Sequence, residues 1–289
     1  MNILYISFYF PPFNTMGGIR AAGQVKELEK AGHKVKVLSS NFQGDFGELS
    51  LGPFDVKLYQ VSAIHMQKNK NENLATKSFK TVLRNIILGN KNFPFREFLF
   101  YAKEFLIFKH GLQKRWRKMV LDDVQSIKNW QPEIIFASYS PLASLKIAAD
   151  LSKVLSIPYF AEMRDSWSFN PMVSFKNENN LLSKILRRFE KKLLDNCSGI
   201  ISSTSFIEEY YSGSLPLIPN KKIYGGFDNF HQQSGNTLIN RLGKKFVITH
   251  AGSLLQGRKS PEILFKAIAS NETLKRNFTI NFFGHDQDA

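Results

Sequence analysis

The sequence contains little cysteine and few acidic residues. Its 289 residues include a single cysteine, Cys197, so an internal disulfide is excluded and a reducing, cytoplasmic location is expected. A buried small hydrophobe is the favoured interpretation of Cys197. Lysine and arginine number 39 against 24 aspartates and glutamates, a formal net charge of +15. This balance favours anionic partners: phosphate-bearing ligands, nucleic acid or an anionic membrane surface.

Other absences narrow the function. No uninterrupted apolar run approaches the length of a membrane-spanning helix, so any membrane contact is expected to be peripheral. Side chains are not clustered at metal-ligand spacing, and no Gly-x-Ser-x-Gly turn occurs. We therefore expect neither a metal nor another cofactor. The Gly-x-Gly-x-x-Gly dinucleotide pattern also fails at the first glycine turn, where Arg20 stands.

Strand and helix patterns alternate along the chain. Residues 3–8 form a short apolar run, Gly17-Gly18 and a helical pattern ending at Gly32 follow, and residues 34–38 alternate as a second strand. Such a unit almost always makes parallel strands. Further strands are predicted at 133–138, 158–161 and 199–202, and helices at 142–155, 181–196 and 205–211. The pattern predicts an α/β fold with a Rossmann-like, doubly wound parallel sheet.

The chain is expected to hold two domains. Residues 1–228 form the first, and the polar stretch 229–245 is the linker. Residues 246–289 begin a second Rossmann-like domain, with strands at 246–251 and 278–283 around a helix at 261–269. We expect this second domain to be truncated, because the sequence stops after its second strand.

Residues 79–118 form a basic, aromatic and largely helical insertion with a net charge of +8. Three interpretations stay open. The segment lies on anionic lipid with its basic side chains toward the headgroups, or its aromatic side chains are core and its charges a solvated face, or it binds nucleic acid. The last is disfavoured because no nucleic-acid-binding module is recognisable.

The turn after the first strand has the ingredients of a phosphate site. Gly17-Gly18 precedes a helix, and glycines there let backbone N–H groups approach a phosphate that the helix dipole attracts. A plain flexible loop before a helix is the alternative.

Four motifs carry a resemblance to a known family. In order, they are Tyr9-Phe10-Pro11-Pro12 with Gly17-Gly18 and Arg20, then Ile157-Pro158-Tyr159 with Arg164-Asp165-Ser166-Trp167, then Gly226-Phe227-Asp228, and last Ala251-Gly252-Ser253 with Gly257-Arg258-Lys259. Together they resemble retaining GT-B glycosyltransferases of family 4, which transfer a sugar from a nucleotide donor to an acceptor. The resemblance covers almost the whole chain, although Gly225 stands where the family usually has asparagine.

The resemblance implies roles for the matching residues. The donor diphosphate would be bound by six of them: Gly17, Gly18, Gly252, Ser253, Arg258 and Lys259. Cations and N–H groups aimed at the leaving diphosphate can do what a metal does elsewhere. The alternative for Arg258-Lys259 is a solvated basic loop.

Arg164 and Asp165 follow a predicted strand and are the candidate catalytic residues. Asp165 would orient or deprotonate an acceptor hydroxyl; the alternative is an Arg–Asp pair that holds the loop together. The candidate acceptor-binding residues are Arg20, Glu162, Trp167 and Ser138, with Trp167 packed on a sugar ring.

The expected function is transfer of a sugar from a nucleotide sugar to a lipid- or glycan-linked acceptor in cell-surface polysaccharide synthesis, at the inner membrane face. The family's E-x7-E pair, which holds the donor sugar and ribose, would lie beyond residue 289. A non-catalytic acceptor- or membrane-binding module is therefore an alternative, and a nucleotide-sugar epimerase of the same architecture is a weaker one.

Overall fold

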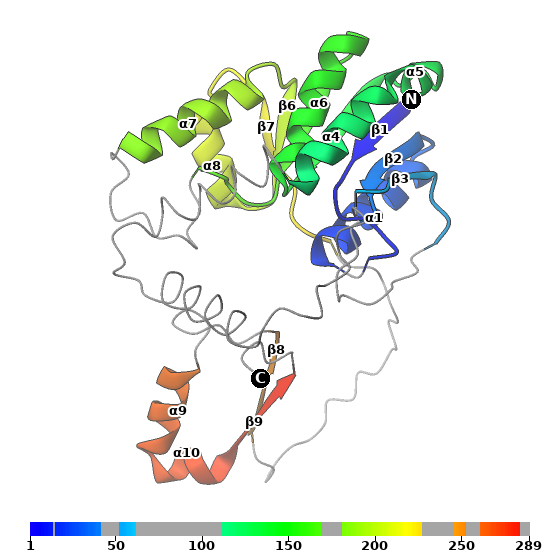
Figure 1. Ribbon diagram of the computed structural model, residues 1–289. Coiled ribbons are helices and arrows are strands. Elements are labelled where there is room, and N and C mark those ends of the chain that lie inside the picture. Colours follow the sequence, from blue (N-terminus) through cyan, green and yellow to red (C-terminus); the bar gives the residue numbers. More distant parts are fainter. Residues whose placement is uncertain are drawn as a thin grey trace, which may run out of the picture. The chain divides into compact units, whose positions relative to one another are not determined.

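The computed structural model describes residues 1–13, 15–41, 52–61, 111–168, 181–226, 246–252 and 261–283 (Figure 1). The chain divides into two compact units, Met1–Asp228 and Asn229–Ala289.

The first unit contains a seven-stranded parallel sheet. In chain order its strands are β1 (Asn2–Ile6), β2 (Lys34–Ser40), β3 (Val56–Tyr59), β4 (Ile134–Tyr139), β5 (Tyr159–Met163), β6 (Gly199–Ser202) and β7 (Asn220–Lys222). In space they run β3-β2-β1-β4-β5-β6-β7, and each neighbouring pair is parallel. The winding therefore reverses between β1 and β4, which makes this point the topological switch of the sheet.

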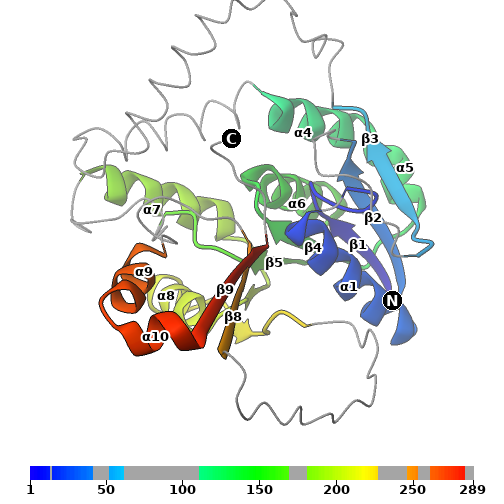
Figure 2. The same cartoon turned by 90° about the horizontal axis from the view of Figure 1, so that it is seen from below.

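Six helices of this unit are described. They are α1 (Met16–Lys30), α4 (Leu112–Asp122), α5 (Val124–Asn129), α6 (Leu142–Leu155), α7 (Leu181–Leu194) and α8 (Ser205–Ser214). Figures 1 and 2 show α4 and α6 side by side over the sheet.

Alternate side chains of β1 enter two separate clusters. Leu4 and Ile6 belong to the larger one, to which α4, α6, α7 and α8 also contribute. Ile3 and Tyr5 belong to the other, which they share with Ala21 and other residues of α1. Both faces of the sheet are thus covered, as the apolar run at 3–8 requires. The predicted α/β fold with a doubly wound, Rossmann-like parallel sheet is confirmed.

Local signals fix the bounds of α1. The side chain of Thr15 caps the helix, accepting a hydrogen bond from the backbone N of Gly18 at 3.0 Å. Gly32 follows the helix with a φ of +84°, a conformation that glycine adopts without a Cβ clash. Local sequence signals therefore set both the start and the end of α1.

The second unit is described for two strands and two helices. β8 (Phe246–Ala251) and β9 (Phe278–Phe283) form a parallel pair, and α9 (Glu262–Ala269) and α10 (Glu272–Asn277) connect them. Within the described residues of this unit no side chain is buried, and Phe246, Ile263 and Phe283 are exposed.

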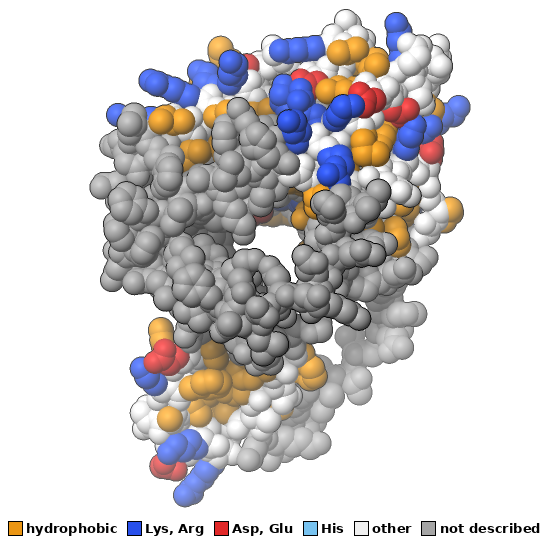
Figure 3. Space-filling model, viewed as in Figure 1, with side chains coloured by type: hydrophobic (Ala, Val, Ile, Leu, Met, Phe, Trp, Pro, Cys, Tyr) orange, Lys and Arg blue, Asp and Glu red, His pale blue; other side chains and the backbone are white. Residues whose placement is uncertain are grey.

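The predicted basic insertion falls mostly outside the described residues, as does the predicted linker 229–245. The described end of the insertion, 111–118, forms the N-cap and the first part of α4. Trp116 there is fully buried, whereas Lys114 and Lys118 are exposed. Figure 3 shows Lys and Arg side chains spread over α4, α6 and α7. For the described stretches, no helix combines the length and the apolar character needed to cross a membrane.

Candidate functional site

The candidate site lies at the carboxyl edge of β1, β4 and β5, on both sides of the switch point. The chain leaves β1 toward α1, β4 toward α6, and β5 into the loop that begins with Arg164. Ligands of doubly wound sheets bind outside the carboxyl ends of the strands at this point. The fold thus brings the predicted residues Gly17, Ser138 and Arg164 to one edge of the sheet.

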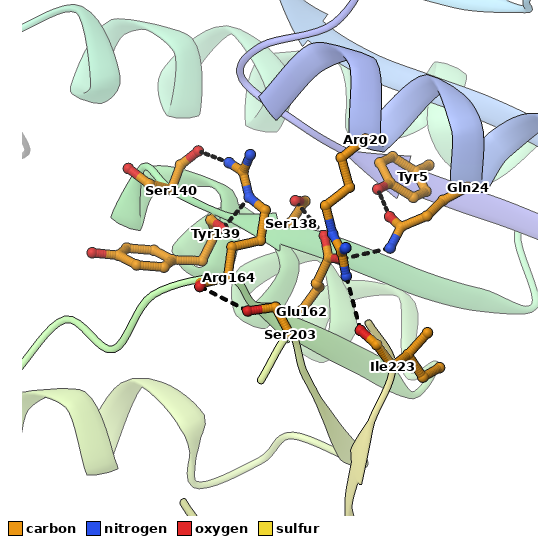
Figure 4. A network of polar contacts seen from close by, with 10 residues as sticks. All are labelled: Tyr5, Arg20, Gln24, Ser138, Tyr139, Ser140, Glu162, Arg164, Ser203 and Ile223. Atoms are coloured by element: carbon orange, nitrogen blue, oxygen red, sulfur yellow. Dashed lines mark hydrogen bonds and ion pairs between the residues drawn. The ribbon is translucent and has the colours of Figure 1, made fainter. Parts of the chain in front are cut away.

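Arg164 is held by groups at the carboxyl ends of β4 and β6. Its Nε donates to the carbonyl oxygen of Tyr139 at 2.6 Å, and its Nη2 donates to that of Ser140 at 3.0 Å (Figure 4). The hydroxyl of Ser203 donates to the backbone oxygen of Arg164 at 2.9 Å. The side chain is partly buried, and these bonds hold its guanidinium in one orientation.

The free edge of that guanidinium lies against the first turn of α1. A Cβ atom built on Gly17 would stand 2.3 Å from Nη1 of Arg164, a separation that real Cβ atoms do not show. Any side chain at position 17 would therefore displace the Arg164 guanidinium from this contact. The sequence pattern placed both residues in the site but did not predict this contact.

The electrostatics of this contact favour an anion. A helix N-terminus carries a partial positive charge, and the first turn of α1 has no acidic side chain to balance it. Arg164 adds a full positive charge at the same place. An anion beside these two positive charges would relieve their mutual repulsion.

The two glycines have different roles. The N–H of Gly18 already donates to the Thr15 cap, and a Cβ on Gly18 would lie 3.0 Å from the Thr15 hydroxyl and 3.1 Å from the backbone oxygen of Phe13. Gly18 is thus needed for the turn itself, whereas Gly17 faces Arg164.

Beneath this surface lies a fully buried carboxylate, Glu162. Its Oε1 accepts from Nε of Arg20 at 2.7 Å and from the side-chain amide of Gln24, and its Oε2 accepts from the Ser138 hydroxyl at 2.6 Å. The Tyr5 hydroxyl in turn donates to Gln24, and burial raises the pKa of Tyr5 well above its ordinary value. The charge of Glu162 is thus satisfied entirely from within the unit.

This burial corrects two predicted roles. Glu162 and Ser138 are 0% and 1% exposed, so neither side chain reaches an acceptor; Glu162 binds Arg20, and Ser138 donates to Glu162. The guanidinium of Arg20 also donates to the backbone oxygen of Ile223 at 3.2 Å, where the chain leaves β7. Arg20 therefore connects α1, β5 and the segment after β7 (Figure 4).

Asp165 and Trp167 differ in their exposure to solvent. Asp165 is exposed at the edge of the sheet, and its carboxylate has no ion pair among the residues that the structure describes. The alternative of an Arg164–Asp165 pair is not what holds the loop, because Arg164 bonds to carbonyl oxygens instead. Trp167 is only 3% exposed and packs on Phe189, with ring centroids 5.4 Å apart. The predicted sugar-stacking role of Trp167 is therefore corrected to a packing role.

The remaining predicted residues belong to the second unit. Gly252 follows β8 with a φ of +134°, and its N–H donates to the backbone oxygen of Phe283 at 2.8 Å. Ser253, Arg258 and Lys259 lie outside the described residues. Their donor-binding roles stay predictions.

Some residues of the site were missed from the sequence. Gln24 lies one helical turn after Arg20, and this i,i+4 spacing on one face was a signal that could have found it. The carbonyl groups of Tyr139 and Ser140 carried no such signal, since any residue supplies a carbonyl.

The next features are the potential metal ligands and the single thiol in the described part of the chain. No group of three or more potential metal-ligating side chains occurs there. Cys197 is buried, and this burial raises the pKa of its thiol to about 11, which disfavours the reactive thiolate.

Comparison with known proteins gives structural likenesses only. No protein-family model matches the chain, and no curated protein matches it. HepE of Anabaena in complex with UDP is 14% identical, with a TM-score of 0.49, over 100% of this chain and 70% of its own. UGT89C1 of Arabidopsis thaliana complexed with UDP-L-rhamnose is 11% identical, with a TM-score of 0.49, over 99% of this chain and 70% of its own. MnaA of S. aureus with UDP is 11% identical, with a TM-score of 0.44, over 99% of this chain and 62% of its own. At these identities the likeness concerns the fold alone.

Proposed function

We propose that the chain is a glycosyltransferase of the retaining GT-B type that binds the diphosphate of a nucleotide sugar at the N-terminus of α1. One observation carries this proposal: the guanidinium of Arg164 is held by two carbonyl groups against Gly17, in a helical turn without acidic side chains. The family resemblance of the sequence motifs supports the same assignment.

The chemistry assigns a role to each side of this contact. In sugar transfer the bond between the anomeric carbon and the diphosphate breaks, a bond to the acceptor oxygen forms, and negative charge grows on the leaving diphosphate. Arg164 and the N-terminus of α1 stabilise that charge without needing to reorganise. The exposed Asp165, next along the loop, orients the acceptor hydroxyl and takes up its proton.

Further donor contacts are proposed from the second unit. Gly252, Ser253, Arg258 and Lys259 bind the same diphosphate, and no metal takes part. This division of labour rests on the resemblance of their motif to the family.

We further propose a lipid-linked or glycan acceptor and peripheral contact with an anionic membrane in cell-surface polysaccharide synthesis. Exposed basic side chains of α4, α6 and α7 support this contact; they include Lys114, Lys153, Arg188, Lys191 and Lys192. Some neighbouring charges are neutralised within the helices, as in the Lys118–Asp122 and Lys146–Asp150 pairs. The unneutralised cations attract anionic headgroups.

Calorimetric titration of UDP, GDP and ADP into the full chain tests the binding step. We expect one of the three to bind, and Arg164→Gln to weaken that binding about 10- to 100-fold, the loss of a hydrogen bond from a charged group. The matched control is Arg188→Gln, which removes an exposed arginine of α7 and should bind like the wild type. If none of the three nucleotides binds the wild-type chain, the proposal fails.

Product analysis after incubation with nucleotide sugars tests the chemistry. Release of the nucleoside diphosphate with a glycosylated acceptor supports transfer. Binding without turnover would favour the non-catalytic module instead, and isomerisation of the intact nucleotide sugar would favour an epimerase.

A further inference from the structure

A second buried carboxylate lies outside the network of Glu162. Glu190 stands on α7, where Lys184, Arg188, Lys191 and Lys192 are exposed and Arg187 is half-buried. Glu190 is 3% exposed and turned into the unit. A carboxylate in such surroundings is retained only if its oxygens find good hydrogen-bond donors.

The donors come from the loop that follows β5 and from α8. The backbone N–H groups of Trp167 and Ser168 donate to Oε1 of Glu190 at 3.1 Å and 3.4 Å. The hydroxyl of Tyr211 donates to the same oxygen at 2.6 Å. The Ser168 hydroxyl donates to Oε2, and that of Tyr210 lies 3.4 Å from it. All of these donors are neutral. Groups of the loop after β5 and of α8 together stabilise the one negative charge of Glu190.

We propose that Glu190 is a positioning residue that holds the loop 164–168 and thereby places Arg164 against Gly17 and Asp165 at the surface. This inference rests on the proposed function for the meaning of those two placements. Ser203 fixes the first residue of the loop through its hydroxyl, and Glu190 fixes the last two through their N–H groups. Asp165 projects between these two attachments.

The carboxylate is suited to this task because one oxygen can accept from two consecutive N–H groups while the other accepts from hydroxyls. Hydrogen bonds to an ionised acceptor are roughly twice as strong as neutral ones. The groups facing Glu190 are Tyr210 and Tyr211 from α8 and Ser168 from the loop, with Arg187 of α7 acting on Tyr210. Burial raises the pKa of Glu190, while its hydrogen bonds act in the opposite direction.

Amide hydrogen exchange tests the attachment directly. In Glu190→Gln at about pH 8, above the usual carboxyl range, the amides of Trp167 and Ser168 should exchange about tenfold faster than in the wild type. The matched control is Glu209→Gln, the same chemical change at an exposed position of α8, which should leave these rates unchanged. Equal protection in Glu190→Gln and the wild type would refute the attachment.

UDP affinity and kcat separate positioning from mere support of the fold. If Glu190 positions the loop, folded Glu190→Gln should bind UDP about tenfold more weakly and show a lower kcat. If it only supports the fold, the variant would melt at a lower temperature but keep the wild-type affinity and kcat, and the inference would be wrong. Glu190→Asp keeps the charge on a shorter side chain and should recover part of both losses.

A second variant and the nucleotide binding of the wild type separate failure of this inference from failure of the proposed function. Should Glu190→Gln fail to fold, Tyr211→Phe removes one donor from the same carboxylate without changing charge, and should weaken UDP binding about threefold. Unchanged binding by Tyr211→Phe would then count against the inference. A wild-type chain that binds none of UDP, GDP and ADP overturns the proposed function instead, and the exchange rates of Trp167 and Ser168 alone then decide whether Glu190 holds the loop.

Discussion

Replacing Gly17 by alanine should separate ligand binding from stability. The added Cβ would stand 2.3 Å from Nη1 of Arg164, and ordinary contact begins at 3.4 Å, so the guanidinium must move away from the first turn of α1. The atom in conflict is the far end of a flexible side chain, so the fold can accommodate the change. The position of the cation beside the helix N-terminus cannot be kept.

The magnitudes follow from the contacts. Alanine favours a helix over glycine by about 0.5–1 kcal/mol, and disturbing a bond from Arg164 to Tyr139 or Ser140 costs about as much, so the unfolding free energy should change by less than about 1 kcal/mol. Loss of the charge-assisted contact to a phosphate costs about 1.5–3 kcal/mol, which weakens binding about 10- to 100-fold.

Urea unfolding followed by tryptophan fluorescence measures the unfolding free energy, and calorimetric titration with UDP measures the affinity for the nucleotide. The control is Gly23→Ala on the same helix, where an added Cβ meets nothing within 4 Å. It should gain about 0.5–1 kcal/mol of stability and bind UDP like the wild type. The reasoning is refuted if Gly17→Ala binds UDP as tightly as Gly23→Ala does.

Three further predictions concern the two buried carboxylates and the basic helical face. Glu162→Gln removes one partner of a buried ion pair and should lower the unfolding free energy by about 3 kcal/mol in urea denaturation; a loss below about 1 kcal/mol would contradict the geometry. Because burial raises the pKa of Glu190, the folded chain keeps that proton to higher pH than the unfolded chain does. The unfolding free energy of the wild type relative to Glu190→Gln should therefore increase as the pH falls from about 8 to about 5, and a difference that is flat or reversed in calorimetry would disprove it. Reversing the charges of Arg188, Lys191 and Lys192 to glutamate should abolish co-sedimentation with phosphatidylglycerol vesicles, with phosphatidylcholine vesicles as the uncharged control; unchanged co-sedimentation would exclude this face.

In the seven-stranded sheet, the strands that sequence patterns predicted are those that lie between the two edge strands. β1 and β4 are apolar runs at the centre of the sheet, and their signal is strong because burial demands it. The edge strands β3 and β7 were missed. Their sequences, VKLY and NKK, carry charges and are short, as edge strands often are, so periodicity does not mark them.

The location of the candidate site could be predicted, but the direction of its side chains could not. Residues following the central strands must meet at one edge, which brought Gly17 and Arg164 together. Whether Trp167 faces a ligand or the core depends on α7 and α8, which follow it in the sequence and draw its loop inward through Glu190. Pairing of Glu162 with Arg20 likewise depends on tertiary packing across the sheet.

The side chain of Arg20 links a buried carboxylate to the segment of chain that leaves β7. The guanidinium that neutralises Glu162 also binds the backbone of Ile223, and a Cβ on Gly225 would stand 3.1 Å from its Nη1. Any event that draws Arg20 away from Glu162 would also release the peptide that leaves the sheet. A spin label or fluorophore attached near Gly225 would therefore report on a charge buried in the middle of the sheet, although the label itself stands in water.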